Sequence, residues 1–171
     1  NKLQLTNAAV TLSGDSLFFL GTSPAITTTA NAAHSIANNL TLDGTTTMNI
    51  ASNTTTLGGS LNGNGGITKT GSGTLVLSGA NTHTGSTAVS AGTVNLRHAS
   101  ALGDGDVTVA SGSALELQGG IRVSGARATL TGSGAVNGAL RSVSGNNEWA
   151  GAVSAVPVSG ITRVGCDADT L

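Results

Sequence analysis

Charged and aromatic residues are scarce in this sequence of 171 residues, at 9% and 2% respectively. An ordinary globular domain carries roughly one quarter charged residues, so a conventional layered core is not expected. The formal net charge is -1, and the lysines and arginines stand singly rather than in a basic stripe. Nucleic acid is therefore excluded as a partner, because phosphates need clustered cations and unpaired bases need aromatic rings to stack on.

Cysteine and long apolar runs are also nearly absent. Cys166 is the single cysteine, so an intrachain disulfide is excluded. The apolar run from Leu17 to Leu20 is only as long as one buried strand, and the sequence contains no transmembrane segment. The sequence opens at Asn1 without an initiator methionine or a signal peptide and stops at Leu171 within a strand-like pattern, which predicts a piece of a longer protein.

Glycine, by contrast, is abundant. The 26 glycines are about twice the usual share, and apolar residues recur at a regular spacing that a disordered chain does not show. Short runs of alternating β-forming residues are separated by Gly with Ser, Asn or Asp, as in Gly73–Gly79, Gly92–Leu96, Asp106–Gly112 and Ser113–Leu117. This pattern predicts all-β structure, with glycines at sharp corners.

These strands recur with a period of about 20 residues, which is typical of solenoid coils rather than of a sandwich. We therefore predict a single domain over residues 1–171, an all-β, right-handed parallel β-helix of about eight coils of roughly 20 residues. Its strands stack at about 4.8 Å, with Val, Leu and Ile pointing into a narrow core. The apolar centres align at Leu75, Val94, Leu115, Val136 and Val156.

Helix is not expected anywhere. The only stretch in which a helical turn could be argued runs from Ala30 to Leu42, and its asparagines disfavour one. Pro24 and Pro157 are isolated, so we expect them at coil corners rather than in a linker.

Residues 65–96 hold an ordered set of turn and strand residues that can be read as one unit. In order and spacing, this segment resembles the passenger-associated transport repeat of bacterial autotransporters. The sequence from Ala99 to Gly112 and from Gly138 to Gly151 extends the resemblance more loosely, whereas His83 and Cys166 depart from it. The residues that carry the resemblance are Lys69, Gly71, Gly73, Leu75, Leu77, Asn81, Thr82, Gly85 and Gly92.

The resemblance implies a passenger that is exported through an outer-membrane barrel of its parent chain and displayed at the bacterial surface. It further implies that the repeat assists export or folding of the passenger. It assigns these motif residues a structural role.

Several short motifs suggest chemistry, and each has a simpler structural interpretation. Gly14-Asp15-Ser16-Leu17 spells the nucleophile block of GDSL-type esterases, whose serine needs a distant Asp and His. None of the three histidines, His34, His83 and His98, has an aspartate three residues ahead of it. We therefore expect a corner turn at residues 14–17.

Metal and phosphate sites are not expected either, and no cofactor is predicted. Asp104 with Asp106, or Asp167 with Asp169, offers too few oxygens for Ca²⁺, which needs about six or more. The glycine-rich stretch over residues 58–66 lacks the Lys-Ser or Lys-Thr of a phosphate loop, so it predicts a coil corner.

The remaining candidates also favour packing over catalysis. Cys166 has no neighbouring His or helix start to activate its thiol, so a small, partly buried side chain is expected. Trp149 is expected to pack against a coil edge rather than to stack on a sugar. The eight carboxylates are spread along the coils, so we predict no enzyme.

We therefore expect a non-catalytic stalk or adhesin segment at the bacterial surface. Its expected partners are a second copy of itself or the surface of a host or neighbouring cell, bound through many weak contacts. Two alternatives remain open. One is the scaffold of a larger secreted enzyme, and the other is a filament subunit that stacks through open coil ends.

Overall fold

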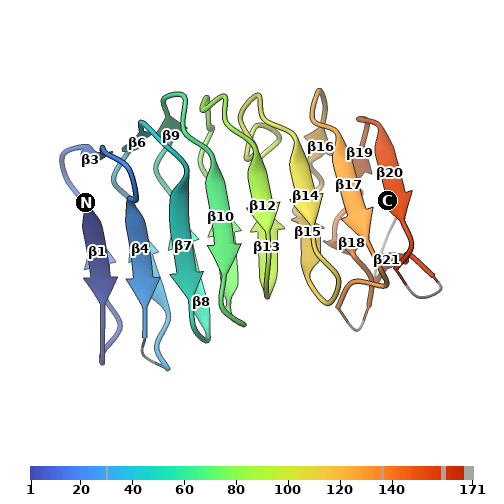
Figure 1. The fold of residues 1–171 in the computed structure, drawn as a ribbon, viewed down its shortest axis with the longest axis horizontal. Coiled ribbons are helices and arrows are strands. Elements are labelled where there is room, and N and C mark those ends of the chain that lie inside the picture. The colour runs from blue at the N-terminus through green and yellow to red at the C-terminus, as the bar shows by residue number, and fades with distance from the viewer. Residues whose placement is uncertain (30, 136, 159–160, 168–171) are drawn as a thin grey trace.

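The computed structural model describes residues 1–29, 31–135, 137–158 and 161–167. It confirms an all-β solenoid of about eight coils: two eight-stranded parallel sheets run the length of the molecule, and the first and last coils lie at opposite ends (Figure 1). The chain runs down the front sheet, returns up the back one and advances along the axis, which is a right-handed winding (Figure 1). The described residues contain no helix, and hence no helix that could span a bilayer.

The first sheet forms the face nearest the viewer in Figure 1. Its strands, in spatial order, are β1 (Lys2–Leu5), β4 (Ala25–Thr28), β7 (Thr46–Ile50), β10 (Ile67–Thr70), β12 (Thr87–Val89), β14 (Val107–Val109), β17 (Ala128–Thr131) and β20 (Val153–Val156).

The second sheet lies behind the first. Its strands are β2 (Thr11–Leu12), β5 (His34–Ile36), β8 (Thr54–Leu57), β11 (Thr74–Leu77), β13 (Thr93–Leu96), β15 (Ala114–Gln118), β18 (Leu140–Ser144) and β21 (Val164–Cys166).

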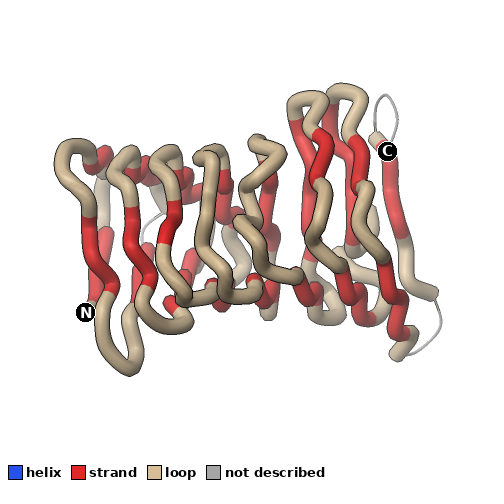
Figure 2. The backbone as a smooth tube through the Cα atoms, turned by 90° about the horizontal axis from the view of Figure 1, so that it is seen from above, coloured by secondary structure: helices blue, strands red, loops and turns tan. Residues whose placement is uncertain are grey.

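A third side carries shorter ladders that do not run the whole length. The first ladder contains β3 (Leu17–Phe19), β6 (Leu40–Leu42) and β9 (Leu61–Asn62), and the second contains β16 (Arg122–Val123) and β19 (Glu148–Trp149). Between β9 and β16 two coils pass without a strand on this side, and their residues form turns and extended loop (Figure 2).

The core consists of columns of inward side chains stacked from coil to coil. In the second sheet one such column is formed by Leu57, Leu77, Leu96 and Leu117, which are paired in register and fully or almost fully buried. This follows from alternation, because every second residue of each strand faces inward and a parallel ladder places like positions above one another.

The predicted alignment is correct from Leu75 to Val94 and Leu115 but wrong beyond them. Leu115 pairs with Leu140, a step of 25 residues, and Leu140 pairs with Val164. Val136 lies outside the described residues, and Val156 belongs to β20 of the first sheet. The cause is a longer corner between β17 and β18, since added turn residues lengthen a coil without changing its strands.

The other expectations about local structure hold. The stretch from Ala30 to Leu42 contains β5 and β6 rather than a helix, with residue 30 outside the described residues. Pro24 directly precedes β4 and Pro157 directly follows β20, so both flank strands. Proline is tolerated at these two positions because they lie outside the strands, where no ladder needs the N–H that proline lacks.

Candidate functional site

Lys69 lies inside the molecule, in a column that is otherwise apolar. Its register partners are Met48 in the preceding coil and Val89 in the following one. The Lys69 side chain is fully buried, and its Nζ donates hydrogen bonds to the carbonyl oxygens of Thr70 at 2.8 Å, Gly71 at 2.8 Å and Ala91 at 3.0 Å. An ammonium group has three donors, so all three are used.

The Lys69 ammonium is solvated by backbone rather than by a counter-ion. Burial lowers the pKa of Lys69 from 10.5 to about 8, because removal from water disfavours the charged form. The described ion pairs all lie elsewhere: Arg122 with Glu148, Arg127 with Asp106, and Arg141 with both Glu116 and Asp167. Lys69 therefore joins two consecutive corners through carbonyl groups alone.

Gly92 leaves the space that this arrangement needs. Its φ of +71° is in the left-handed region, and a Cβ there would lie 2.5 Å from the carbonyl oxygens of Gly71 and Gly73 and 2.9 Å from Lys69 Nζ. Any side chain at this position would overlap with these backbone oxygen atoms. The corner of one coil thus rests directly on the corner of the coil before it.

Asn81 replaces a strand ladder on the third side of the solenoid, where the two coils after β9 have no strand. It is buried, its Oδ1 accepts from Leu61 N at 2.9 Å, and its Nδ2 donates to Ala101 O at 2.6 Å. Leu61 belongs to the coil before and Ala101 to the coil after. One side-chain amide therefore joins three consecutive coils where backbone pairing is interrupted.

The neighbours of Asn81 complete this side of the coil. Thr82 donates to Asn62 Oδ1 at 2.8 Å at the surface, and the position of a Cβ on Gly85 is 2.3 Å from Gly66 N, so only glycine fits. His83 is fully buried, with Nδ1 3.0 Å from the Gly85 carbonyl oxygen. Burial lowers the pKa of His83, outweighing the Gly85 carbonyl and the Asp104 charge, which raise it.

The nine residues that carry the resemblance thus act at three places in consecutive coils. Lys69, Gly71, Gly73 and Gly92 lie at the corner between the two large sheets, and Leu75 and Leu77 are fully buried in β11. Asn81, Thr82 and Gly85 lie on the third side.

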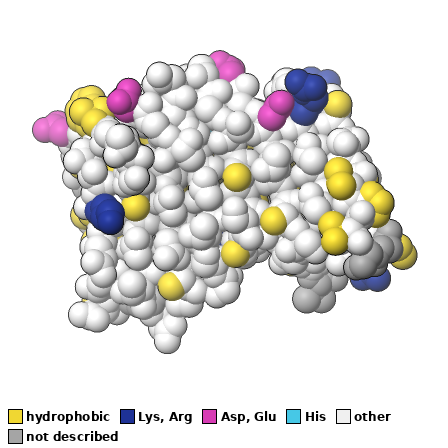
Figure 3. Space-filling model, viewed as in Figure 1, with side chains coloured by type: hydrophobic (Ala, Val, Ile, Leu, Met, Phe, Trp, Pro, Cys, Tyr) yellow, Lys and Arg dark blue, Asp and Glu magenta, His cyan; other side chains and the backbone are white. Residues whose placement is uncertain are grey.

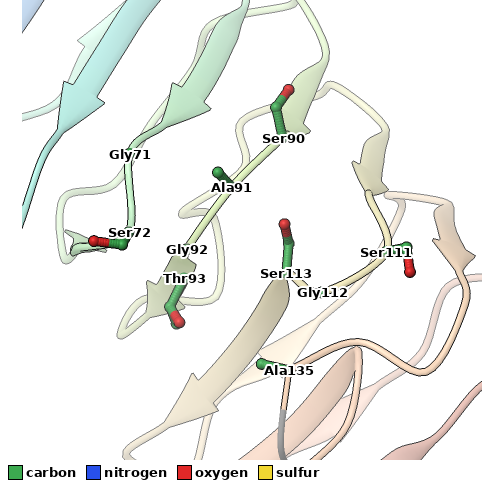
Figure 4. A pocket seen from close by; sticks show the side chains of 10 residues that line it. All are labelled: Gly71, Ser72, Ser90, Ala91, Gly92, Thr93, Ser111, Gly112, Ser113 and Ala135. Atoms are coloured by element: carbon green, nitrogen blue, oxygen red, sulfur yellow. The ribbon is translucent and has the colours of Figure 1, made fainter.

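A groove of about 400 Å³ follows the same corner (Figure 4). Glycine, serine, alanine and threonine line it, so it offers hydroxyl and backbone groups but no titratable side chain. Ser113 contributes a hydroxyl directed towards the turn at Ser90 and Ala91. The Lys69 ammonium lies beneath this surface, bonded to the carbonyls of Gly71 and Ala91. The groove can form hydrogen bonds but supplies no acid, base or nucleophile pair.

Two polar clusters were missed at the level of the sequence. Asn147 is buried, accepts from Gly120 N and Ile121 N at 3.0 Å each, and donates to Ser142 Oγ at 2.9 Å. A buried asparagine outside any strand has no periodic signal by which it could be found.

The second cluster is a charge ladder on the outer face of the second sheet. Glu116 accepts from Asn95 at 3.0 Å and from Arg141 at 2.8 Å, and Arg141 also pairs with Asp167. The register of β13, β15 and β18 places these side chains next to one another. The cluster could not be predicted because the predicted register was wrong beyond residue 115.

The short motifs with suspected chemistry lie in turns. Residues 14–16 are exposed, with a bend at residues 14–15, and Leu17 begins β3; Gly14 has a φ of +115°. The glycine-rich residues 58–66 flank β9 as coil corners. No group of three or more potential metal-binding side chains occurs among the described residues. Asp106 instead pairs with Arg127, and Asp169 lies outside the described residues.

Trp149 packs against the hydrophobic core from β19, as expected. The expectation for Cys166 was wrong, because its side chain is exposed rather than partly buried. Cys166 pairs in register with Ser142 at the end of an inward column. It is nevertheless exposed because no described residue stacks on the last coil.

The comparisons with known proteins agree with this geometry. Neither a curated protein nor a solved structure matches the chain. A family model does match, that of the passenger-associated transport repeat, over residues 67–96. This span runs from the start of β10 to the end of β13 and contains Lys69, Asn81 and Gly92. The contacts of Lys69 and Gly92 described above lie within it, whereas Asn81 reaches Leu61 before it and Ala101 after it. Residues 67–96 of this chain therefore match the passenger-associated transport repeat in sequence, consistent with a repeat of an autotransporter passenger.

Proposed function

We propose that this chain is a non-catalytic, rigid stalk or adhesin segment of a passenger displayed at the bacterial surface, and that its repeat assists export or folding. The observation that carries the proposal is the continuity of the rod. Two parallel ladders run through all eight coils. At the turns outside these ladders, Lys69, Asn81 and Asn147 form hydrogen bonds between neighbouring coils. A stalk needs this stiffness and needs no active site.

The placement of reactive groups supports a structural role rather than catalysis. His34 and His83 are buried, and Cys166 is exposed on the last strand. Glu116 and Asp167 both pair with Arg141, and neutralised carboxylates are poorly suited to general acid or base work.

Limited proteolysis tests the stalk. The native chain is expected to resist cleavage within residues 67–118, because its backbone there is held in ladders and tight corners. The Asn81→Ala variant is expected to be cut near the third side of these coils, and Thr82→Ala, which changes only a surface hydrogen bond, to resist like the native chain. Rapid cleavage of the native chain in this region would contradict a rigid stalk.

A second candidate, the self-assembling filament, is favoured by one observation. The last coil exposes apolar side chains, with Val153 45% and Val164 54% exposed. Coil ends of this kind present unpaired strand edges that a second copy can extend.

Sedimentation velocity across a concentration series separates the two candidates. A filament subunit grows with concentration, and Val164→Lys abolishes this growth, whereas Ser154→Lys on the outer face of β20 preserves it. A native monomer at every concentration contradicts the filament and leaves the stalk.

A further inference from the structure

The outer face of the first sheet carries a regular column of small side chains. Register pairing places Thr47, Thr68, Ala88, Thr108 and Thr129 side by side on five consecutive strands, from β7 to β17. All five are half-buried or exposed, and all alternate with buried inward residues. Figure 1 shows these strands lying side by side with little rotation between them.

A second column runs parallel to the first, two residues further along the chain in each coil. It consists of Asn49, Thr70, Ser90, Ala110 and Thr131, and each of these is half-buried or exposed. Thr70 pairs with Asn49 in register, and the amides of Ser90 and Ala110 continue the hydrogen-bond ladder of the strands before them. We call the two columns together the threonine face.

The threonine face carries no charge. The only lysine within its span is Lys69, which lies between Thr68 and Thr70 and points inward. Figure 3 shows the charged side chains at the rim of this side of the molecule and an uncharged surface across its middle. The aromatic residues of the chain are all in β3 and β19, on the third side.

These properties argue against a macromolecular partner for this face. Protein interfaces rely on buried aromatic and arginine anchors, and the threonine face has neither. Eight strands at about 4.8 Å and four residues at about 3.3 Å give the whole sheet an area on the order of 500 Å². A stable protein interface buries about 800 Å² on each partner, so a second copy is also a poor fit.

What the face offers is a rigid lattice. Its side chains repeat at about 4.8 Å between coils and at about 6.7 Å along each strand. Threonine is stiff at χ1 because it is β-branched, so its methyl and hydroxyl groups are held in place before any contact forms. Preorganised groups bind with little entropic cost, and equal spacing lets many weak contacts act together on a partner that is itself periodic.

We propose that the threonine face binds the surface of ice. The oxygen lattice of ice repeats at nearly the strand spacing, its surface is uncharged, and each water molecule both donates and accepts hydrogen bonds, as a hydroxyl does. The methyl groups order the adjoining water while the hydroxyl groups join its network. This activity is independent of the proposed role as a stalk.

The test is inhibition of ice recrystallisation by the purified chain, with thermal hysteresis as a second readout. Thr108→Arg places a bulky charge in the middle of the face, and Thr11→Arg makes the same change at an exposed threonine of β2 in the second sheet. The native chain and Thr11→Arg are expected to inhibit recrystallisation equally, whereas Thr108→Arg needs a roughly tenfold higher concentration because the lattice contacts no longer act together. Circular dichroism verifies that both variants are folded.

Two results would overturn the proposal. The first is an absence of any effect of the folded native chain on ice growth, and the second is equal activity of the two variants. If Thr108→Arg alters sedimentation of the chain but not ice growth, the face belongs to a second copy and the ice proposal fails. Retention of the native chain on microcrystalline cellulose without any effect on ice also counts against it.

Discussion

The ammonium of Lys69 occupies a position that its column otherwise gives to Met48, Val89 and similar apolar side chains. The pKa of Lys69 is 10.5 in the unfolded chain and about 8 in the folded chain. Between these values folding requires the release of a proton. The free energy of unfolding is therefore expected to rise as pH rises from 8 to 10.5, by about 3 kcal/mol at most.

Urea denaturation at several pH values checks this expectation. The chain has no tyrosine, so no phenol contributes to the pH dependence in this window. Lys69→Met is expected to remove the rise, because methionine fills the column without a titratable group. A native stability that stays flat or falls from pH 8 to 10.5 would show that the three carbonyls hold the charged form as well as water does.

Gly92 gives a second prediction at the residue scale. Gly92→Ala introduces a Cβ 2.5 Å from two carbonyl oxygens at a positive φ, whereas Gly112→Ala at a φ of +80° meets nothing within 4 Å. The Gly112 variant is expected to lose about 1 to 2 kcal/mol from the left-handed backbone alone. The Gly92 variant is expected to lose about 2 kcal/mol more from overlap. Thermal denaturation of the two variants compares them, and equal losses would mean that the corner can relax.

At the scale of a single element, the Asn81 side chain forms the hydrogen bonds between coils that a strand would otherwise form on the third side. Asn81→Ala leaves Leu61 N and Ala101 O buried without partners, and the expected loss is about 2 to 4 kcal/mol. Thr82→Ala is the matched control, since its hydrogen bond to Asn62 is exposed and its loss stays within about 0.5 kcal/mol. Chemical denaturation measures both; a small effect of Asn81→Ala would indicate that water replaces the amide.

Much of each coil was predictable from the sequence, and the reason lies in alternation. Thr74 to Leu77 shows strand propensity directly, and Lys69 has the same inward parity as Ile67 two residues before it. Asn81 was predictable only as a motif residue. Its hydrogen bonds go to the amide of Leu61 and the carbonyl of Ala101, each about 20 residues away along the chain. No local pattern encodes such a contact.

At the scale of the whole molecule, the register was predictable only as far as the coil length stayed constant. From β11 to β15 the steps are near 20 residues, and the predicted column from Leu75 to Leu115 is correct. The long corner before β18 breaks the period. Turn residues can vary in number because they face solvent. The alternating pattern within the strands therefore does not predict how long each corner is.

Stability is expected to vary along the rod, because each coil contacts only its neighbours. The strands β10 to β15 have coils packed on both sides, whereas all four residues of β20 are exposed. Hydrogen–deuterium exchange is expected to be slowest in β10 to β15 and fastest, among the strands, in β20 and β21. Equal protection from β10 through β21 would mean that the rod opens only as a whole.

The contacts of Lys69 and Asn81 also set a sequence of events in time. Lys69 reaches the Ala91 carbonyl, and Asn81 reaches that of Ala101, each about 20 residues further along the chain. Neither side chain can leave water at a low free-energy cost until the next coil has closed over it. Each coil that closes therefore locks the one before it, so assembly proceeds like a ratchet, in which backward slippage means returning a buried amide or ammonium to solvent.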